Sequence, residues 1–460
     1  MTEEGRDRPA DPRRGPAPPR SAYLHIPFCH RRCFYCDFAV VPLGDRADAE
    51  GGPGSASIAH YLALLHREIA QAPPGPPLST VYVGGGTPSM LSAAQLADLL
   101  AALRRRYGLA PGAEITLEMD PASFDRQRLA ATLAAGITRV SLGGQSFDDD
   151  VLERLGRRHR RAELLASAEW LEQARRGGDL ISWSLDLIQG VPLPPGSGEP
   201  LRWWRRQLEQ AIALKPPHLS IYDLIVEPGT VFERLQRRGE LPLPDEDTSA
   251  DLMDQTQAQL CAAGYGHYEV SNYALPGHAS RHNRVYWSGA GWWGFGLGAT
   301  SAPWGVRQAR PRTREAYAAW LEERAPLAAA GGSSQRGAGD AADPAGPGWS
   351  LVTSGEPSSQ KAESPGHGPG TPPCPGVMPF DERVLVGLRR REGVPMASML
   401  HEAGLGPAAL ADLRLQLEGF EQRGLLRIEG PRWRLSDPAG LALSNAVLRE
   451  LLLWWERAGR

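Results

Sequence analysis

Short apolar runs alternate with longer amphipathic stretches through the first half of the chain, and this alternation constrains the fold more than any other feature. The runs are rich in branched residues and predict strands. They lie at 23–26, 81–83, 115–117, 140–142, 181–187 and 219–224. The stretches between them predict helices, among them 58–72, 94–106, 151–158 and 162–175. Such alternation is typical of an α/β protein with parallel strands and crossover helices. The pattern alone does not choose between a barrel and an open sheet.

Three of the five cysteines, Cys29, Cys33 and Cys36, lie within eight residues directly after the first predicted strand. A loop this short cannot join three thiols in disulfides, but it can turn three thiolates toward one centre. On a four-iron cluster, three protein ligands leave one iron open to a small molecule. A zinc site completed by His25 or His30, and cysteines with no shared role, are the alternatives. The spacing favours an open-sided iron-sulfur cluster.

The composition excludes several classes of function. The formal net charge is -3 at pH 7, so no basic field attracts nucleic acid. The sequence has no apolar run of about 18 residues or more and no apolar signal-peptide core. We expect a cytoplasmic protein without a transmembrane segment, in which thiols stay reduced; peripheral contact with a membrane is left open. Cys261 and Cys374 stand alone and are predicted to be free thiols.

Polar residues and glycines follow the predicted strands. The carboxyl ends of parallel strands meet on one face of a barrel, so residues there can share a site. A glycine triplet lets the backbone approach a ligand closely, although a tight turn is its simpler explanation. Each of the other residues alone would more often be an ordinary surface residue. The set comprises Gly85, Gly86 and Thr87 after the second strand, Glu118 after the third, Gln145 after the fourth, Arg157 in the next helix, and Asp186 in the fifth strand.

The stretch from Tyr23 to Cys36, YLHIPFCxxxCxxC, resembles the cluster loop of radical S-adenosylmethionine (SAM) proteins. More narrowly, it is similar to the branch that contains the oxygen-independent coproporphyrinogen III oxidases and the HemW-type haem chaperones. The resemblance implies a partial (β/α)6 barrel and a 4Fe-4S cluster whose open iron chelates the amino and carboxylate groups of SAM. It also implies SAM contacts at Tyr23, Gly85, Gly86, Thr87, Glu118, Gln145, Arg157 and Asp186.

Residues 265–300 are unusually rich in aromatic side chains and histidine. Flat aromatic surface beside an imidazole suits an axially ligated porphyrin. A core segment that closes the barrel would be aromatic as well, and a lone histidine is more often a satisfied core residue than a ligand. The run His282-Asn283-x-x-Tyr286-Trp287 resembles a signature of the HemW type, and this resemblance implies that His282 is a haem ligand.

The remaining segments outline the domain organisation. Residues 1–20 are predicted to be a disordered tail, and the polar, Gly-rich residues 41–56 a loop. The barrel with its aromatic extension takes up 21–329, and a Gly-, Ser- and Pro-rich linker follows at 330–377. Residues 378–460 predict helices at 381–390, 405–419 and 441–455 and a hairpin at 425–435. This is the pattern of a small winged-helix-like α+β domain, and the family has a C-terminal (HemN-type) domain of this kind.

Two functions of different classes follow from the resemblance. The first is a haem chaperone, which binds haem or a related porphyrin as cargo, hands it to unidentified acceptor proteins and receives electrons for its cluster from an unidentified donor. The alternative is a coproporphyrinogen III oxidase of porphyrin biosynthesis. The oxidases carry a fourth cysteine where this chain has Phe38, and a longer N-terminal region before the cysteine strand. These differences and the His282 signature favour the chaperone, while turnover of any kind stays an open question.

Overall fold

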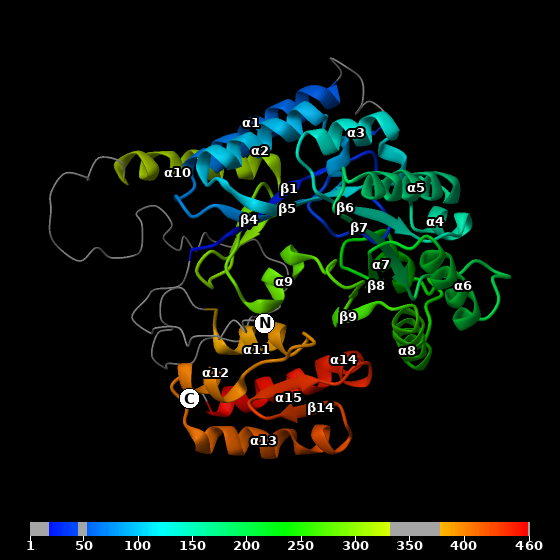
Figure 1. Cartoon of the computed structure of the whole chain (residues 1–460), viewed down its shortest axis with the longest axis vertical. Helices are drawn as coiled ribbons and strands as arrows, with labels where there is room; N and C mark the ends of the chain where they lie inside the picture. Colours follow the sequence, from blue (N-terminus) through cyan, green and yellow to red (C-terminus); the bar gives the residue numbers. More distant parts are fainter. Residues whose placement is uncertain (1–17, 45–52, 332–377, 459–460) are drawn as a thin grey trace.

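Residues 18–44, 53–331 and 378–458 are described by a computed structural model of the chain (Figure 1). Their largest feature is a nine-stranded sheet with the strand order β11-β1-β4-β5-β6-β7-β8-β10-β9. Six central strands run parallel, each bonded to the next in sequence order. They are β1 (Ser21–Ile26), β4 (Leu78–Gly85), β5 (Leu109–Met119), β6 (Arg139–Gln145), β7 (Ser182–Gln189) and β8 (His218–Asp223). Each overlaps a run that the sequence predicts as a strand.

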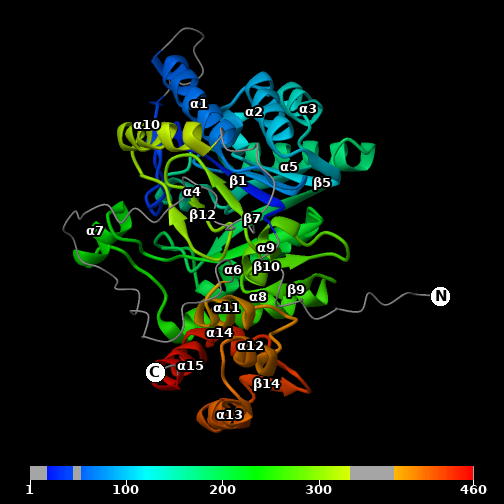
Figure 2. The same ribbon diagram turned by 90° about the vertical axis from the view of Figure 1, so that its left-hand side faces the viewer.

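Crossover helices cover the outer face of this sheet, as the alternation predicts (Figures 1 and 2). In α2, Ser92 and Gln95 form a capping box, and Leu96, Leu99 and Leu103 turn one face into the core. The helices are α1 (Pro53–Gln71), α2 (Ala93–Arg106), α3 (Arg126–Ala134), α4 (Asp149–Arg154), α5 (Arg161–Gly177), α6 (Pro200–Ala213), α7 (Val231–Arg237) and α8 (Glu246–Ala262), with short η2 (Pro88–Met90) and η3 (Pro121–Ser123).

Among the helices predicted before residue 180, two have wrong boundaries. Helix α1 begins at Pro53 rather than at residue 58, because proline suits the first turn of a helix. The sequence did not predict this turn, since residues 53–57 show no apolar periodicity. The predicted loop 41–56 therefore includes the start of α1 and strand β3 (Val41–Pro42); residues 45–52 lie outside the described ranges. Helix α4 ends at Arg154, not at residue 158, because Gly156 turns the chain with φ +78°. Arg157 consequently lies in a turn.

The aromatic segment closes both edges of the parallel sheet. Strand β11 (Trp293–Phe295) pairs parallel with β1, and β10 (Asn272–Ala274) pairs antiparallel with β8 and with β9 (Gly266–Glu269). Trp293 and Phe295 are fully buried. Burial in the sheet thus accounts for part of the aromatic content. The segment also holds helix α9 (Arg281–Ser288) and leads through β12 (Thr300–Ser301) and β13 (Gln308–Ala309) to α10 (Arg314–Gly331).

Residues 378–458 form a separate hydrophobic core around Val384, Leu413, Leu417, Trp433 and Trp454. Helix α12 is too short for a periodic signal, and the sequence did not predict it. The elements are α11 (Phe380–Gly387), α12 (Met396–Glu402), α13 (Pro407–Gln422), the hairpin β14 (Leu426–Glu429) and β15 (Arg432–Leu435), α14 (Ala439–Ala442) and α15 (Ser444–Ala458). Helices with a small hairpin match the winged-helix-like pattern.

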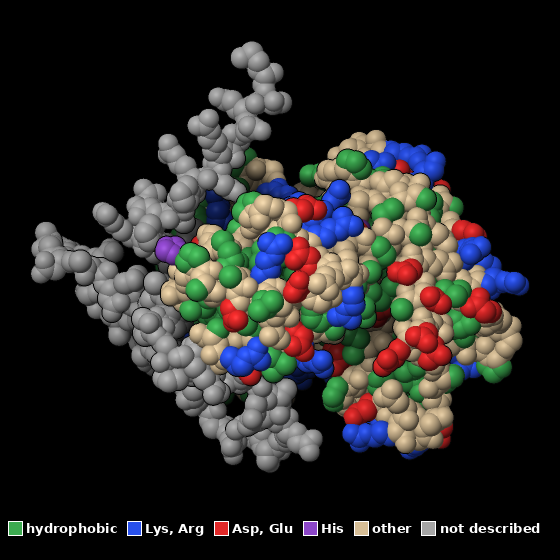
Figure 3. All heavy atoms as spheres, turned by 90° about the horizontal axis from the view of Figure 1, so that it is seen from below, with side chains coloured by type: hydrophobic (Ala, Val, Ile, Leu, Met, Phe, Trp, Pro, Cys, Tyr) green, Lys and Arg blue, Asp and Glu red, His purple; other side chains and the backbone are tan. Residues whose placement is uncertain are grey.

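This C-terminal body lies below the barrel, where α11 packs against α9 (Figures 1 and 2). An ion pair between Arg284 and Glu392 and a 2.8 Å contact between His267 Nδ1 and Asp437 Oδ1 join the two bodies. On the face seen from below, acidic and basic side chains are intermixed rather than gathered by sign (Figure 3). Within the described ranges, no helix combines the length and the apolar character needed to cross a bilayer.

Candidate functional site

The cysteine loop is held by short backbone pairings. Cys29 ends β2 (Phe28–Cys29), and its carbonyl accepts the Leu43 N–H at 2.8 Å across the β2–β3 pair. Cys29 is buried, while Cys33 and Cys36 are half-buried, and all three are free thiols. Burial, and then the neighbouring cysteines, raise the pKa of Cys29 to about 12, and burial raises the pKa of Cys36 to about 11. Thiols of this kind become thiolates only beside strong positive charge, as bound iron provides.

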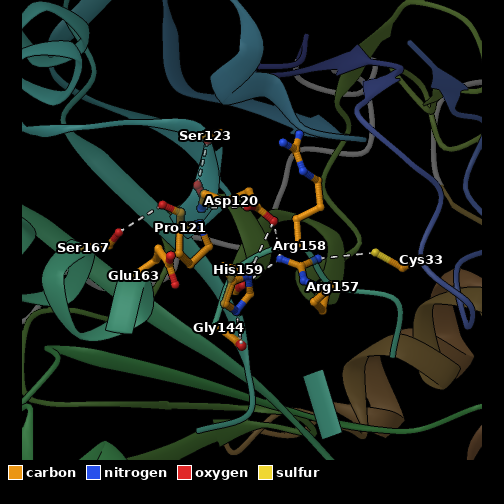
Figure 4. Close-up of polar contacts among 12 residues, drawn as sticks. Cys33, Asp120, Pro121, Ser123, Gly144, Arg157, Arg158, His159, Glu163 and Ser167 are labelled. Atoms are coloured by element: carbon orange, nitrogen blue, oxygen red, sulfur yellow. Dashed lines mark hydrogen bonds and ion pairs between the residues drawn. The ribbon is translucent and has the colours of Figure 1, made fainter. Parts of the chain in front are cut away.

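The same loop is docked on the turn after α4. The Phe34 N–H donates to Leu155 O at 3.0 Å, and Arg31 Nε donates to Gly156 O at 2.8 Å. The Phe34 ring lies so close to Gly156 that a Cβ there would come within 3.0 Å of it. This docking brings Arg157 to the loop, where its Nη1 contacts Cys33 Sγ at 3.6 Å (Figure 4).

Arg157 also reaches a carboxylate at the end of β5. Its Nη2 donates to Asp120 Oδ2 at 2.6 Å (Figure 4). The same atom donates to Gly143 O at 2.8 Å. Burial alone would raise the pKa of Asp120, but Arg157 and His159 outweigh burial and hold it well below its usual range. The guanidinium therefore bridges a cysteine and a strand-end acid. Sequence reasoning missed Asp120, although it lies two residues after Glu118 and alternation places both on one face.

The glycine triplet lies where β4 passes against the cysteine loop. A Cβ on Gly86 would meet Phe28 O at 2.6 Å and Cys29 Sγ at 2.8 Å. Gly85 has φ +120°, and a Cβ there would meet the His25 ring at 2.7 Å. A hydrogen bond from the Thr87 side chain to Cys29 opposes the rise of the thiol pKa. Only glycine, which has no Cβ, allows the backbone at positions 85 and 86 to come this close to His25 and the cysteine loop.

Gly86→Ala is expected to destabilise the protein by about 1–3 kcal/mol, because the added methyl overpacks the cysteine loop. It is also expected to lower the iron and sulfide bound after reconstitution. Gly419→Ala is the matched control, since a Cβ at Gly419 in α13 meets open space. Urea unfolding and iron analysis of both variants provide the measurement. Full iron content in Gly86→Ala would contradict the prediction.

His25 is already occupied by protein partners. Its Nε2 donates to Ala39 O at 2.9 Å, so its Nδ1 accepts the Tyr23 hydroxyl at 3.0 Å. Burial lowers the pKa of His25, which keeps the ring neutral. His25 thus has no nitrogen free for zinc. In the described ranges, no three Cys, His, Asp or Glu side chains converge as they would on a single ion. A cluster does not demand such convergence, because each thiolate binds a different iron.

Glu118 is fixed by two donors at the end of β5. Tyr82 Oη donates to its Oε1 at 2.9 Å, and the Gly85 N–H donates to its Oε2 at 2.9 Å. Burial raises the pKa of Glu118 to about 7, and the charge of Asp186 adds to this rise. Tyr23 stacks on Tyr82 with centroids 6.1 Å apart. The carboxylate is therefore an oriented acceptor.

Gln145 lies at the end of β6 as predicted, whereas Asp186 lies inside β7, because the buried apolar pattern carries this strand on to Gln189. Asp186 accepts hydrogen bonds from Ser141 at 2.8 Å and from Ser184 at 3.2 Å, and burial raises its pKa. Gln145 lies at a bulge of β6 with φ +63°, and its buried Oε1 has no partner among the described residues. A Cβ on Gly143 would come within 3.2 Å of both Gln145 Nε2 and Arg157 Nη2. The predicted SAM positions thus lie in or directly after β1 and β4–β7, except Arg157, which lies in the turn after α4.

His282 lies apart from this edge, on α9. It is fully buried; Thr80 Oγ1 lies 2.8 Å from its Nδ1 and Tyr286 Oη lies 2.7 Å from its Nε2. Burial lowers the pKa of His282 to about 3, so the ring is neutral. Both nitrogens are engaged, and binding to haem iron would require one of these bonds to open. Haem ligation by His282 stays a prediction.

This fold and three-cysteine loop define a radical SAM protein, and the comparisons agree. Residues 23–185 match the model of the radical SAM superfamily, and residues 380–442 match the HemN C-terminal domain. The computed structure resembles that of coproporphyrinogen III oxidase (HemN) from Escherichia coli with a TM-score of 0.68, covering 96% of this chain and 91% of that one. At 19% identity this likeness concerns the fold alone.

The particular family follows from closer relatives. The chain is 43% identical over 305 residues to a protein of Synechocystis sp. named heme chaperone HemW, covering 66% of this chain and 71% of that protein. It is 39% identical to the Escherichia coli protein of the same name, over 61% of this chain and 70% of that one. The chain belongs to the HemW family of radical SAM proteins.

Proposed function

We propose that this protein is a haem chaperone that binds haem and transfers it to acceptor proteins, with a 4Fe-4S cluster and SAM as its cofactors. The observation that carries this proposal is the close relationship to proteins named heme chaperone HemW. The coproporphyrinogen oxidase alternative has less support, because Phe38 stands at the position of the oxidases' fourth cysteine. A cytoplasmic location is part of this proposal, because thiols stay reduced there and can bind a metal.

We assign the cluster to Cys29, Cys33 and Cys36. Bound there, a cluster supplies an open iron for chelation and an electron for the cleavage of SAM. Other residues of the chain would bind and orient SAM. Arg157 places a cation beside Cys33, and Glu118 is an oriented hydrogen-bond acceptor. Gly85 and Gly86 let the backbone come close to the ligand. The proposed SAM contacts are Tyr23, Gly85, Gly86, Thr87, Glu118, Gln145, Arg157 and Asp186.

SAM binding is expected to strengthen about tenfold between about pH 6 and pH 8. The pKa of Glu118 is raised to about 7 by burial, so the free carboxyl is partly protonated near neutrality. A donor on SAM favours the ionised form, so binding releases a proton and the affinity rises with pH. The titratable groups that act on this carboxyl are Tyr82, Tyr23, Tyr222, Tyr286 and Asp186, and the Gly85 N–H also donates to it.

Isothermal titration calorimetry of the cluster-loaded protein measures this dependence. In Glu118→Gln the carboxyl no longer titrates, and any remaining pH dependence belongs to the amino group of SAM or to other residues. If SAM affinity depends on pH in that variant as it does in the wild type, the ionisation of Glu118 does not contribute to SAM binding.

The function itself is tested anaerobically on reconstituted protein. One sample receives SAM, a reductant and coproporphyrinogen III, and protoporphyrinogen formation is followed; a parallel sample is titrated with haem by absorbance. We expect stoichiometric haem binding without decarboxylated product. Turnover without stable haem binding would identify an oxidase instead. Under the haem-ligand prediction, His282→Ala loses the wild-type haem spectrum, whereas His278→Ala keeps it.

A further inference from the structure

Helix α9 packs against β4 and is hydrogen-bonded to β5, two strands that carry residues of the proposed SAM site. Ser280 caps the helix, and the carboxylate of Glu114 in β5 accepts the N–H groups of Arg281 at 3.0 Å and His282 at 2.9 Å. An acid at these free N–H groups also opposes the helix dipole favourably. Glu114 lies four residues before Glu118 on the same strand and face. The position of α9 is therefore tied to the strand that carries Glu118.

His282 projects from this helix onto β4. Its Nδ1 is hydrogen-bonded to Thr80, and its ring lies over the ring of Tyr82 with centroids 5.2 Å apart and planes at 29°. Thr80 and Tyr82 are two residues apart on one strand, so both face the same side. Behind the imidazole, the edge of Tyr286 contacts it, and Trp292 packs against Tyr286. The imidazole is thus clamped between β4 and Tyr286.

The position of the Tyr82 ring in turn affects the carboxylate of Glu118. The Tyr82 hydroxyl donates to Glu118 Oε1 at 2.9 Å. Packing around the pair is tight, because a Cβ on Gly84 would lie 2.8 Å from the Tyr82 ring and 2.9 Å from Glu118 Oε1. A shift of the tyrosine ring would therefore move its hydroxyl away from the carboxylate or push the carboxylate aside.

We propose that His282 is a positioning residue of the SAM site, which acts through Tyr82 on Glu118. This inference rests on the proposed SAM contact of Glu118 and assigns to the His282 signature a role other than haem ligation. An aliphatic side chain at position 282 would leave the hydroxyls of Thr80 and Tyr286 without their partner and remove the ring that supports Tyr82. The neutral imidazole satisfies both hydroxyls whichever nitrogen carries its proton.

The test measures SAM affinity by calorimetry, melting temperature and haem binding in one set of cluster-loaded variants. His282→Ala is expected to weaken SAM binding by up to about tenfold, the scale of one lost aromatic contact. Thr80→Val is expected to weaken SAM binding less than His282→Ala does, because only the hydroxyl is lost. Thr80→Ser keeps the hydroxyl and is expected to keep the wild-type affinity. His278→Ala is the matched control, since this half-buried histidine bonds Ser182 of β7, which lies three strands away from β4 in the sheet.

A double-mutant cycle separates positioning from general destabilisation. In a Tyr82→Phe background the hydroxyl that His282 positions is gone, so His282→Ala should weaken SAM binding less than in the wild type. Equal losses in both backgrounds, or losses that follow the melting temperature as in His278→Ala, would overturn the inference. Wild-type SAM affinity in His282→Ala would also overturn it.

The haem titration distinguishes this inference from the proposed function. Loss of haem binding in His282→Ala with SAM affinity retained would make His282 a haem ligand and reject the positioning role. Weaker SAM binding with normal haem binding supports the inference. If the wild-type protein binds no haem, the chaperone proposal fails, and the SAM measurements still decide the role of His282.

Discussion

Replacing Cys29, Cys33 or Cys36 by Ala is expected to abolish the bound cluster and, with it, measurable SAM binding. In the proposed site each thiolate would hold a different iron, and two remaining ligands would leave a second iron exposed. Metal affinity in such a site is coupled to the deprotonation of all its thiols, and burial raises the pKa of Cys29 and Cys36. Iron and sulfide analysis after anaerobic reconstitution, followed by calorimetry with SAM, measures both effects.

Cys261→Ser is the matched control, because Cys261 is an exposed free thiol of α8. It should bind iron, sulfide and SAM as the wild type does. Wild-type iron content in any of the three loop variants would show that the corresponding cysteine is not a ligand.

Arg310→Met is expected to destabilise the protein by about 3–5 kcal/mol, because it leaves the carboxylate of Glu68 buried without its countercharge. The two side chains are 1% and 2% exposed, and Arg310 Nε lies 2.7 Å from Glu68 Oε1. The other carboxylate oxygen accepts the Tyr317 hydroxyl at 2.5 Å and the Gly296 N–H at 2.7 Å. Urea unfolding measures the loss.

Two further variants test the cause. Glu68→Gln combined with Arg310→Met should recover part of the stability, since no uncompensated carboxylate remains. Arg237→Met removes the exposed Arg237–Glu233 pair and should cost less than about 1 kcal/mol. A small effect of Arg310→Met alone would mean that Glu68 takes up a proton or finds water at little cost.

The Arg310–Glu68 ion pair is connected through neighbouring residues to β1, the strand that precedes the cysteine loop. Gly296, which donates to Glu68, approaches Tyr61 closely, and the Tyr61 hydroxyl donates to His25 O at 2.6 Å. His25 in turn holds Tyr23 and Ala39 on either side of the cysteine loop. Sequence reasoning did not connect Glu68 with this loop, because its partner Arg310 lies 242 residues away.

Some residues of the candidate site can be predicted from the local sequence, and others cannot. Cys29, Cys33 and Cys36 lie within eight residues, Glu118 directly follows a predicted strand and Asp186 lies in one, so spacing and strand pattern point to them. Tyr82 lies in β4 and Asp120 directly follows β5, and neither has a distinguishing sequence pattern. Their importance comes from partners on other elements, Arg157 for Asp120 and Glu118 for Tyr82.

The sequence by itself determined the α/β class, the six parallel strands and the cysteine loop, because residue periodicity records which faces are buried and spacing records which ligands can converge. Only the tertiary structure decided what those faces are buried against. Residues 265–300 close both edges of the sheet, and His282 meets Thr80 across 202 residues. Such pairings depend on the register of strands and the docking of helices, which no local pattern encodes.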